Sequence, residues 1–277
     1  MKSFFLLRRV RGVALVLAFS LALVLVGRQS APHLRQLAFL TGWTLWAVLI
    51  FLTLYNARKK LPFLPLGSSR LWLQLHAYVG YFSAILFLAH VSWRLPHGGF
   101  EITLTLLYVI VAGSGVLGLW WSRYVPRRLT SRGGEVLYER IPVIRRRLQD
   151  EAEALSLTSV SVGQTTAIAD FYRRHLADFF RGPRNFPGHL FANHRPLNRQ
   201  RERIEDLRRF LTPDQQRHLD ALSDLVQQKD SLDHQYALQS SLKWWLFVHI
   251  PLTYNLLIAT GLHLVLVHGF SLGAASH

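Results

Sequence analysis

The sequence predicts an all-α membrane protein: a polytopic helical bundle of five spans, with a mostly helical cytoplasmic insertion between spans four and five. Of the 277 residues 50% are hydrophobic. They gather in runs of about twenty, the length needed to cross a hydrocarbon core of about 30 Å. None of the eight tryptophans lies within residues 122–242, and six of them flank the apolar runs, as aromatic side chains do at a membrane interface.

The first predicted span follows a basic flank and therefore also looks like a signal peptide. Its apolar run is long for a signal peptide, however, and the residues after it, GRQSAPH, form a poor cleavage site. We therefore expect a retained helix. The five predicted spans are residues 10–27, 37–56, 71–93, 102–121 and 243–268.

The insertion begins with an expected helix over residues 135–155, which Pro142 interrupts near its start. A second helical segment is expected over residues 165–180, where apolar residues recur with a helical period. The stretch that follows, 181–198, is rich in Pro, Gly and Asn and is expected to be irregular.

The last part of the insertion predicts two more helices, over residues 199–211 and 213–242. Thr212 and Pro213 give a clear start signal for the second one, because Thr is a good N-cap and Pro fits the first helical position. No loop signal separates this helix from span five, so the two are expected to be continuous. The predicted domains are residues 1–121 (spans one to four), 122–242 (the helical cytoplasmic insertion) and 243–277 (span five and a short outer tail).

The net charge of +16 lies mainly in the short flanks of the spans. The insertion, residues 122–242, holds 20 Lys or Arg against 15 Asp or Glu, whereas the rest of the chain holds 12 against the single acid Glu101. No nucleic-acid module stands out, so a nucleic-acid partner is not expected. Because positive flanks stay in the cytoplasm, the N-terminus and the insertion are expected inside and the C-terminus outside, in a bacterial inner membrane.

The chain has no cysteine. Disulfides, thioether-linked haem and cysteine-ligated iron–sulfur clusters are therefore excluded, and a redox centre must be held by histidine or bound non-covalently. The insertion carries no dinucleotide, phosphate-loop or flavin fingerprint. Its histidines lack the spacing of a metal site and are expected to be surface or capping residues. They are His175, His189, His194, His218 and His234.

Two predicted spans each carry a pair of histidines with the same spacing, H-x13-H. His76 and His90 lie in span three, and His249 and His263 lie in span five. Fourteen residues make close to four helical turns, so the rings of one pair lie on nearly the same face, about 21 Å apart along the axis. Such histidines also serve helix–helix hydrogen bonds, but ionisable residues are rare in a bilayer and usually face a site.

In both spans the first histidine lies at the same distance along the sequence from the nearest preceding cation. Arg70 precedes the first histidine of span three by six residues, and Lys243 precedes the first histidine of span five by six. Histidines at two matching depths give two bis-imidazole sites, which suits two non-covalent b-type haems. Arg70 and Lys243 are candidate partners for haem propionates at the inner face. Gly80 and Gly261 suit the close approach of either a macrocycle or another helix.

The expected inner site pairs His76 with His249, and the expected outer site pairs His90 with His263. All four residues are candidate iron ligands. His268 is the nearest rival to His263, but its spacing of 19 residues from His249 does not match the other span. It is expected to be interfacial, as is His97.

At these four histidines the chain resembles two families of di-haem membrane cytochromes b. One is the cytochrome b of quinol-oxidising bc complexes, and the other is the ferric reductase-like transmembrane family, which includes the membrane domain of NADPH oxidases. The second resemblance implies ligand pairs on spans three and five, which the four histidines match. The printed chain lacks the motif PEWY, a sixth span and a flavin or NADPH domain, and its cytoplasmic loop is longer than that family's. The resemblance therefore implies haem ligation and electron transfer across the membrane, without implying superoxide formation, ferric reduction or quinol chemistry.

The expected function is that of a di-haem b-type cytochrome, the electron-transfer subunit of a membrane oxidoreductase complex in a respiratory chain. Electron donor and acceptor come from elsewhere. Quinone at a membrane face, a cytoplasmic-side redox subunit docked on the insertion and a periplasmic electron carrier are the open candidates. The alternative is a haem-free membrane anchor or assembly protein, in which the histidines serve only helix packing.

Overall fold

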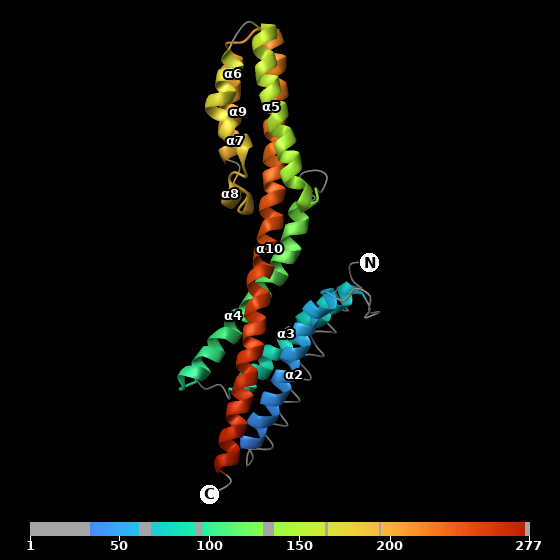
Figure 1. The fold of residues 1–277 in the computed structure, drawn as a ribbon, viewed down its shortest axis with the longest axis vertical. Coiled ribbons are helices and arrows are strands. Elements are labelled where there is room, and N and C mark those ends of the chain that lie inside the picture. Colours follow the sequence, from blue (N-terminus) through green and yellow to red (C-terminus); the bar gives the residue numbers. More distant parts are fainter. Residues whose placement is uncertain are drawn as a thin grey trace, which may run out of the picture. The chain divides into compact units, whose positions relative to one another are not determined.

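Helices make up nearly all of the chain that the structure describes. The structure is a computed structural model, drawn as a ribbon in Figure 1. No strand occurs within the described ranges, which confirms the predicted all-α class. The first predicted span, residues 10–27, lies outside them. The described residues are 34–60, 68–91, 96–129, 136–163, 166–193 and 195–274.

Four helices of the described chain are long and apolar enough to cross a membrane, as expected for an integral membrane protein. They contain the predicted spans two, four and five and residues 71–90 of span three. The Ser68 hydroxyl caps one of them by accepting a hydrogen bond from the Leu71 N–H at 3.4 Å. The four are α2 (Leu34–Lys60), α3 (Ser69–His90), α4 (Gly99–Leu129) and α10 (Pro213–Ala274).

Helix α10 is continuous over 62 residues, which confirms that the last helix of the insertion runs into span five. It begins at Pro213, as predicted. The Thr212 N–H donates to Gln215 Oε1 at 3.0 Å, and the Thr212 carbonyl accepts from the Gln216 N–H at 2.9 Å, so both polar groups of the cap are satisfied. Pro251 lies inside the helix without ending it.

Helix α4 continues to Leu129, beyond the predicted end of span four at residue 121. Its added residues include Val125 and Leu129, which are buried against Leu238 of α10. Trp121 Nε1 also donates to Ser241 Oγ at 2.6 Å. Packing against α10 therefore extends the helix, and the arginines that surround these apolar residues hid this in the sequence.

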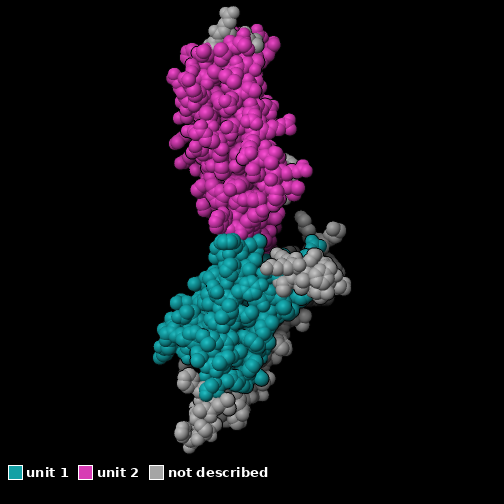
Figure 2. Space-filling model, in the orientation of Figure 1, with its two compact units in different colours: residues 1–120, 245–277 teal, residues 121–244 magenta. Residues whose placement is uncertain are grey.

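The chain divides into two compact units, which Figure 2 colours separately. The membrane unit comprises residues 1–120 and 245–277, and the insertion unit comprises residues 121–244. Helices α4 and α10 contribute residues to both. In the membrane unit, buried side chains from all four helices form one cluster: Leu45, Leu49, Leu86, Tyr108 and Leu256.

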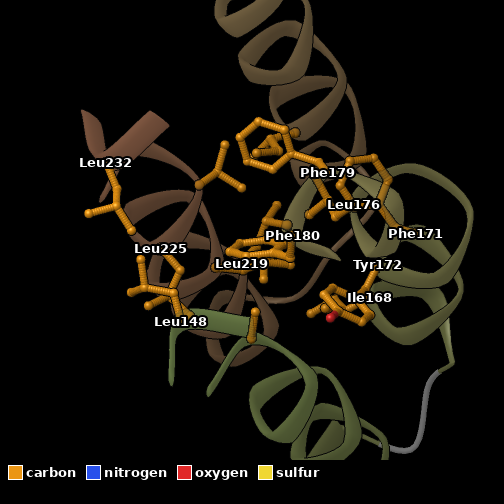
Figure 3. Packing of buried hydrophobic residues seen from close by; sticks show 14 of the residues in the cluster. Leu148, Ile168, Phe171, Tyr172, Leu176, Phe179, Phe180, Leu219, Leu225 and Leu232 are labelled. Atoms are coloured by element: carbon orange, nitrogen blue, oxygen red, sulfur yellow. The ribbon is translucent and has the colours of Figure 1, made fainter. Parts of the chain in front are cut away.

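The insertion unit packs short helices against α5 (Ile141–Gly163) and the first half of α10. Figure 3 shows the centre of its core, where Leu176 and Phe180 approach Leu219 of α10. The remaining elements are η3 (Tyr138–Arg140), α6 (Ala167–Phe171), the π-helical η4 (Tyr172–Leu176), α7 (Ala177–Arg181), α8 (Phe186–Leu190) and α9 (Arg195–Arg208).

Two expectations about the insertion were wrong in detail. Pro142 does not interrupt a helix, because α5 begins at Ile141 and Pro142 lies in its first turn, where no backbone donor is needed. The stretch 181–198 is not wholly irregular, since it contains α8 and the start of α9. Asn185 and Ala192, both with φ of 58°, flank α8 in the left-handed region.

Candidate functional site

His90 closes α3 and lies against the start of α2. Its Nδ1 is 3.1 Å from the Ala38 carbonyl oxygen and 3.3 Å from Thr41 Oγ1. The Ala38 oxygen can only accept, so the imidazole carries its hydrogen on Nδ1. The ring lies close to Gly42, where a β carbon would be 3.0 Å from His90 Cε1. The Nε2 lone pair of a neutral His90 is therefore available as a metal ligand.

His249 is held in the same tautomer from α4. Its Nδ1 lies 2.6 Å from Ser114 Oγ, and that hydroxyl donates its own hydrogen to the Val111 carbonyl at 2.8 Å. Because the hydroxyl hydrogen is already used, Ser114 Oγ accepts from Nδ1–H of the imidazole. A hydrogen bond that fixes one ring nitrogen and leaves the other as a lone pair is the usual arrangement around metal-binding histidines.

His263 of α10 lies beside Phe100 of α4, with ring centroids 6.2 Å apart. The two inner candidates contact different helices. His76 lies beside Tyr55 of α2, with ring centroids 5.2 Å apart, and His249 lies beside Ser114 of α4. The four histidines thus belong to one unit, with α2 and α4 supplying the groups that orient three of the rings.

His268, the rival to His263, lies among aromatic side chains. Its Nδ1 donates to the Leu264 carbonyl at 2.9 Å, within its own helix. Its ring lies 5.3 Å from that of Phe39 and 5.6 Å from that of Trp43, measured between centroids. This aromatic setting resembles an interfacial cluster more than a ligand site.

The other candidate site residues fall into two groups. Gly80 and Gly261 have no described atom within 4 Å of the position that a β carbon would occupy, so no described helix packs on them. Arg70 is exposed in the first turn of α3. Lys243 Nζ donates to Glu139 Oε1 at 3.0 Å and lies 3.6 Å from the centre of the Tyr138 ring, all within the insertion unit.

Glu139 shows the effect of that contact. Hydrogen bonding to its own backbone, followed by hydrogen bonding and attraction to Lys243, lowers the pKa of its carboxyl below the ordinary value of 4.5. The pair therefore stays charged at neutral pH. Its contribution to stability is present above pH 4.5 and is lost as the pH falls through the lowered pKa.

The sequence interpretation missed a buried polar cluster in the insertion unit. Lys229 and Asp233 are 0% and 1% exposed. Lys229 Nζ donates to Asp233 Oδ2 at 2.5 Å and to the Gly182 carbonyl at 2.7 Å, while the Arg184 N–H donates to the same carboxylate oxygen at 3.0 Å. The cluster ties the segment after α7 to α10. The i,i+4 spacing of Lys229 and Asp233 was the one available signal.

Two histidines of the insertion were also assigned wrongly. His189 and His234 are buried, and their rings lie 5.9 Å apart between centroids. His189 Nε2 is 3.7 Å from Asp230 Oδ1, which makes it a neighbour of the buried cluster. His175 is exposed, as expected, His218 is partly exposed, and His194 lies outside the described residues.

The contact between Gly42 and His90 gives a first prediction. Gly42→Val is expected to destabilise the membrane unit by about 1–3 kcal/mol, because the new side chain overlaps the ring. Gly113→Val is the matched control and is expected to be neutral or slightly stabilising, since its β carbon meets no described atom and Val favours a helix more than Gly does. Thermal unfolding in detergent compares them. Equal midpoints for both variants would show that His90 does not rest on Gly42.

In the part of the chain that the structure describes, no group of three or more His, Cys, Asp or Glu side chains is placed to hold a metal ion. A haem iron with two axial histidines needs no such group. No protein-family model, curated protein or solved structure matches this chain.

Proposed function

We propose that this protein is a di-haem b-type cytochrome, an electron-transfer subunit of a membrane redox complex. His76 and His249 are the ligands of an inner haem, and His90 and His263 are the ligands of an outer haem. The membrane part has five spans, residues 10–27 forming the first. The N-terminus and insertion face the cytoplasm of a bacterial cell, and the C-terminus lies outside.

One observation carries the proposal. Two of the four histidines, one from each pair, have Nδ1–H fixed by a hydrogen bond, to Ala38 at His90 and to Ser114 at His249. Each ring thereby keeps Nε2 unprotonated, which is the state an iron ligand needs.

The surroundings suit a flat macrocycle. Open space beside Gly80 and Gly261 leaves room one turn after His76 and two residues before His263. Bound haem supplies one-electron chemistry at iron. The chain's own part is to orient the four imidazoles, to exclude water through the apolar helices around them and to offer Arg70 to a propionate.

The proposed partners follow from what the chain lacks. In its described residues it presents four apolar helices and a helical insertion, and its sequence carries no flavin or nucleotide motif. Electrons must therefore enter and leave through other molecules. A quinone at a membrane face, a cytoplasmic-side subunit on the insertion and a periplasmic carrier fill these roles in the proposal.

Two non-covalent haems per chain are the expected result of purification from membranes. The reduced-minus-oxidised spectrum should be of the b type, and acid acetone should extract all of the haem, because no Cys exists to form a thioether. Pyridine haemochrome analysis against protein concentration gives the stoichiometry. A correctly folded but colourless protein would favour a haem-free membrane anchor instead.

A further inference from the structure

Ser114 of α4 holds two residues of α10 that lie one turn apart. Its hydroxyl accepts from His249 Nδ1 at 2.6 Å, and its carbonyl accepts from Trp245 Nε1 at 2.9 Å. Trp245 stacks on His249, with centroids 5.1 Å apart and planes inclined by 22°. The ring of His249 is thus hydrogen-bonded at Nδ1 by Ser114 and covered on one face by the indole of Trp245.

Glycines make this arrangement possible. The indole of Trp245 occupies the place that a β carbon of Gly118 would take, so only glycine fits there. At Gly115 a β carbon would come within 3.7 Å of His249 Cε1, which is ordinary contact. Helix α4, which carries no histidine, therefore presents a surface shaped to receive this one turn of α10.

We infer that Ser114 is a positioning residue that fixes His249 as an axial ligand and sets the redox potential of the inner haem. This inference rests on the proposed function. An acceptor at Nδ1–H raises the basicity of an imidazole ligand, because it draws the shared proton away from the ring. A more basic ligand favours ferric iron. Ser114 therefore holds the inner midpoint potential below the value it would have without the hydroxyl.

The proposed outer ligand, His90, does not depend on a side-chain hydroxyl in this way. Its Nδ1 partner is the Ala38 carbonyl, a backbone group that no substitution removes, and Thr41 Oγ1 is more distant at 3.3 Å. The two proposed sites therefore differ in their hydrogen-bond acceptor. A side-chain hydroxyl accepts from the inner ligand His249, whereas a main-chain carbonyl accepts from the outer ligand His90. A change at position 114 should act on one haem alone.

The test compares Ser114→Thr with Ser114→Val in the purified full-length protein. These side chains have nearly the same shape, and only Thr keeps the hydroxyl. Spectroelectrochemistry resolves the two midpoint potentials, and the low-spin EPR signals report each ligand pair. We expect Ser114→Val to raise the inner potential and shift its EPR signal, with the outer haem unchanged, whereas Ser114→Thr resembles the native protein.

Ser83→Ala is the matched control. Ser83 is another buried hydroxyl of the membrane unit, hydrogen-bonded to Tyr108 at 2.9 Å, with no histidine partner in those bonds. It should shift neither potential. If Ser114→Val loses both haems, Ser114→Ala removes the hydroxyl without added bulk and decides by the same readouts.

The outcomes separate this inference from the proposed function. Two haems in the native protein, with identical potentials in the Thr and Val variants, would overturn the role of Ser114 and leave the proposed function standing. A native protein without haem would overturn both. A shift of both haems by similar amounts would show general loosening of the bundle and also contradict a specific role for Ser114.

Discussion

Asp233→Asn is expected to destabilise the insertion unit by about 3–5 kcal/mol, because it leaves the Lys229 ammonium buried without its counter-charge. The side chain of Lys229 is fully buried, and beyond Asp233 it has the Gly182 carbonyl and the ring of Phe179, whose centre lies 4.2 Å away. Neither replaces a carboxylate, and the buried Asp230 acts on Lys229 more weakly than Asp233 does. Lys229→Met should cost less, since Arg145 and the Arg184 N–H still face Asp233.

A double variant distinguishes a specific pair from general damage. Lys229→Met combined with Asp233→Leu removes both charges and should recover much of the loss, because buried ion pairs are replaceable by apolar pairs of similar size. Arg173→Met is the surface control. It breaks an exposed ion pair with Asp170 at 3.0 Å and should cost at most about 1 kcal/mol.

Native-state hydrogen exchange of α7 and α10 amides measures these changes, because it reports opening of the insertion unit by itself. Faster exchange in Asp233→Asn, restored in the double variant, is the expected pattern. Equal exchange in Asp233→Asn and Arg173→Met would contradict a buried ion pair at this position.

The second large effect concerns the ligands. His249→Ala is expected to lower the haem content from two per chain to one, with loss of the inner haem's spectrum and potential. His90→Ala should remove the outer haem instead. In each variant the affected haem would lose one of its two histidine ligands, and its binding would leave polar groups unpaired among apolar side chains.

His268→Ala and His97→Ala are the controls for these ligand variants, and both should retain two haems. The ring of His268 lies against the rings of Phe39 and Trp43, and His97 is exposed. Loss of a haem in His268→Ala together with its retention in His263→Ala would move the outer ligand to position 268. Variants of His76 and His263 complete the set and should match their pair partners.

How far the sequence predicts this protein depends on the kind of contact. Runs of apolar residues predicted α2 and α3 well, because the length of a span is a property of the chain itself. The start of α10 at Pro213 was predicted for the same reason, because the start signal lies in the adjacent residues Thr212 and Pro213. The end of α4 was not, since Val125 and Leu129 are helical partly because Leu238 packs on them.

The candidate site shows the same division. The spacing of the four histidines is visible in the sequence, whereas the hydrogen bond from His249 to Ser114 depends on the rotation of α4 about its axis. Lys229 and Asp233 were not singled out in the sequence. Their burial depends on Gly182 and Arg184, which come from a connecting segment with no helical period to indicate where it packs.

The order of the two units along the chain has a consequence for biosynthesis. Residues 121–244 of the insertion unit are continuous, whereas the membrane unit is split into residues 1–120 and 245–277. On the ribosome the insertion unit is therefore complete before span five is made. Under the proposed function, His76 and His90 are synthesised before this unit, and their partners His249 and His263 are synthesised after it. Both proposed haem sites can then close only after the insertion unit has been made, so haem loading is expected to follow its synthesis.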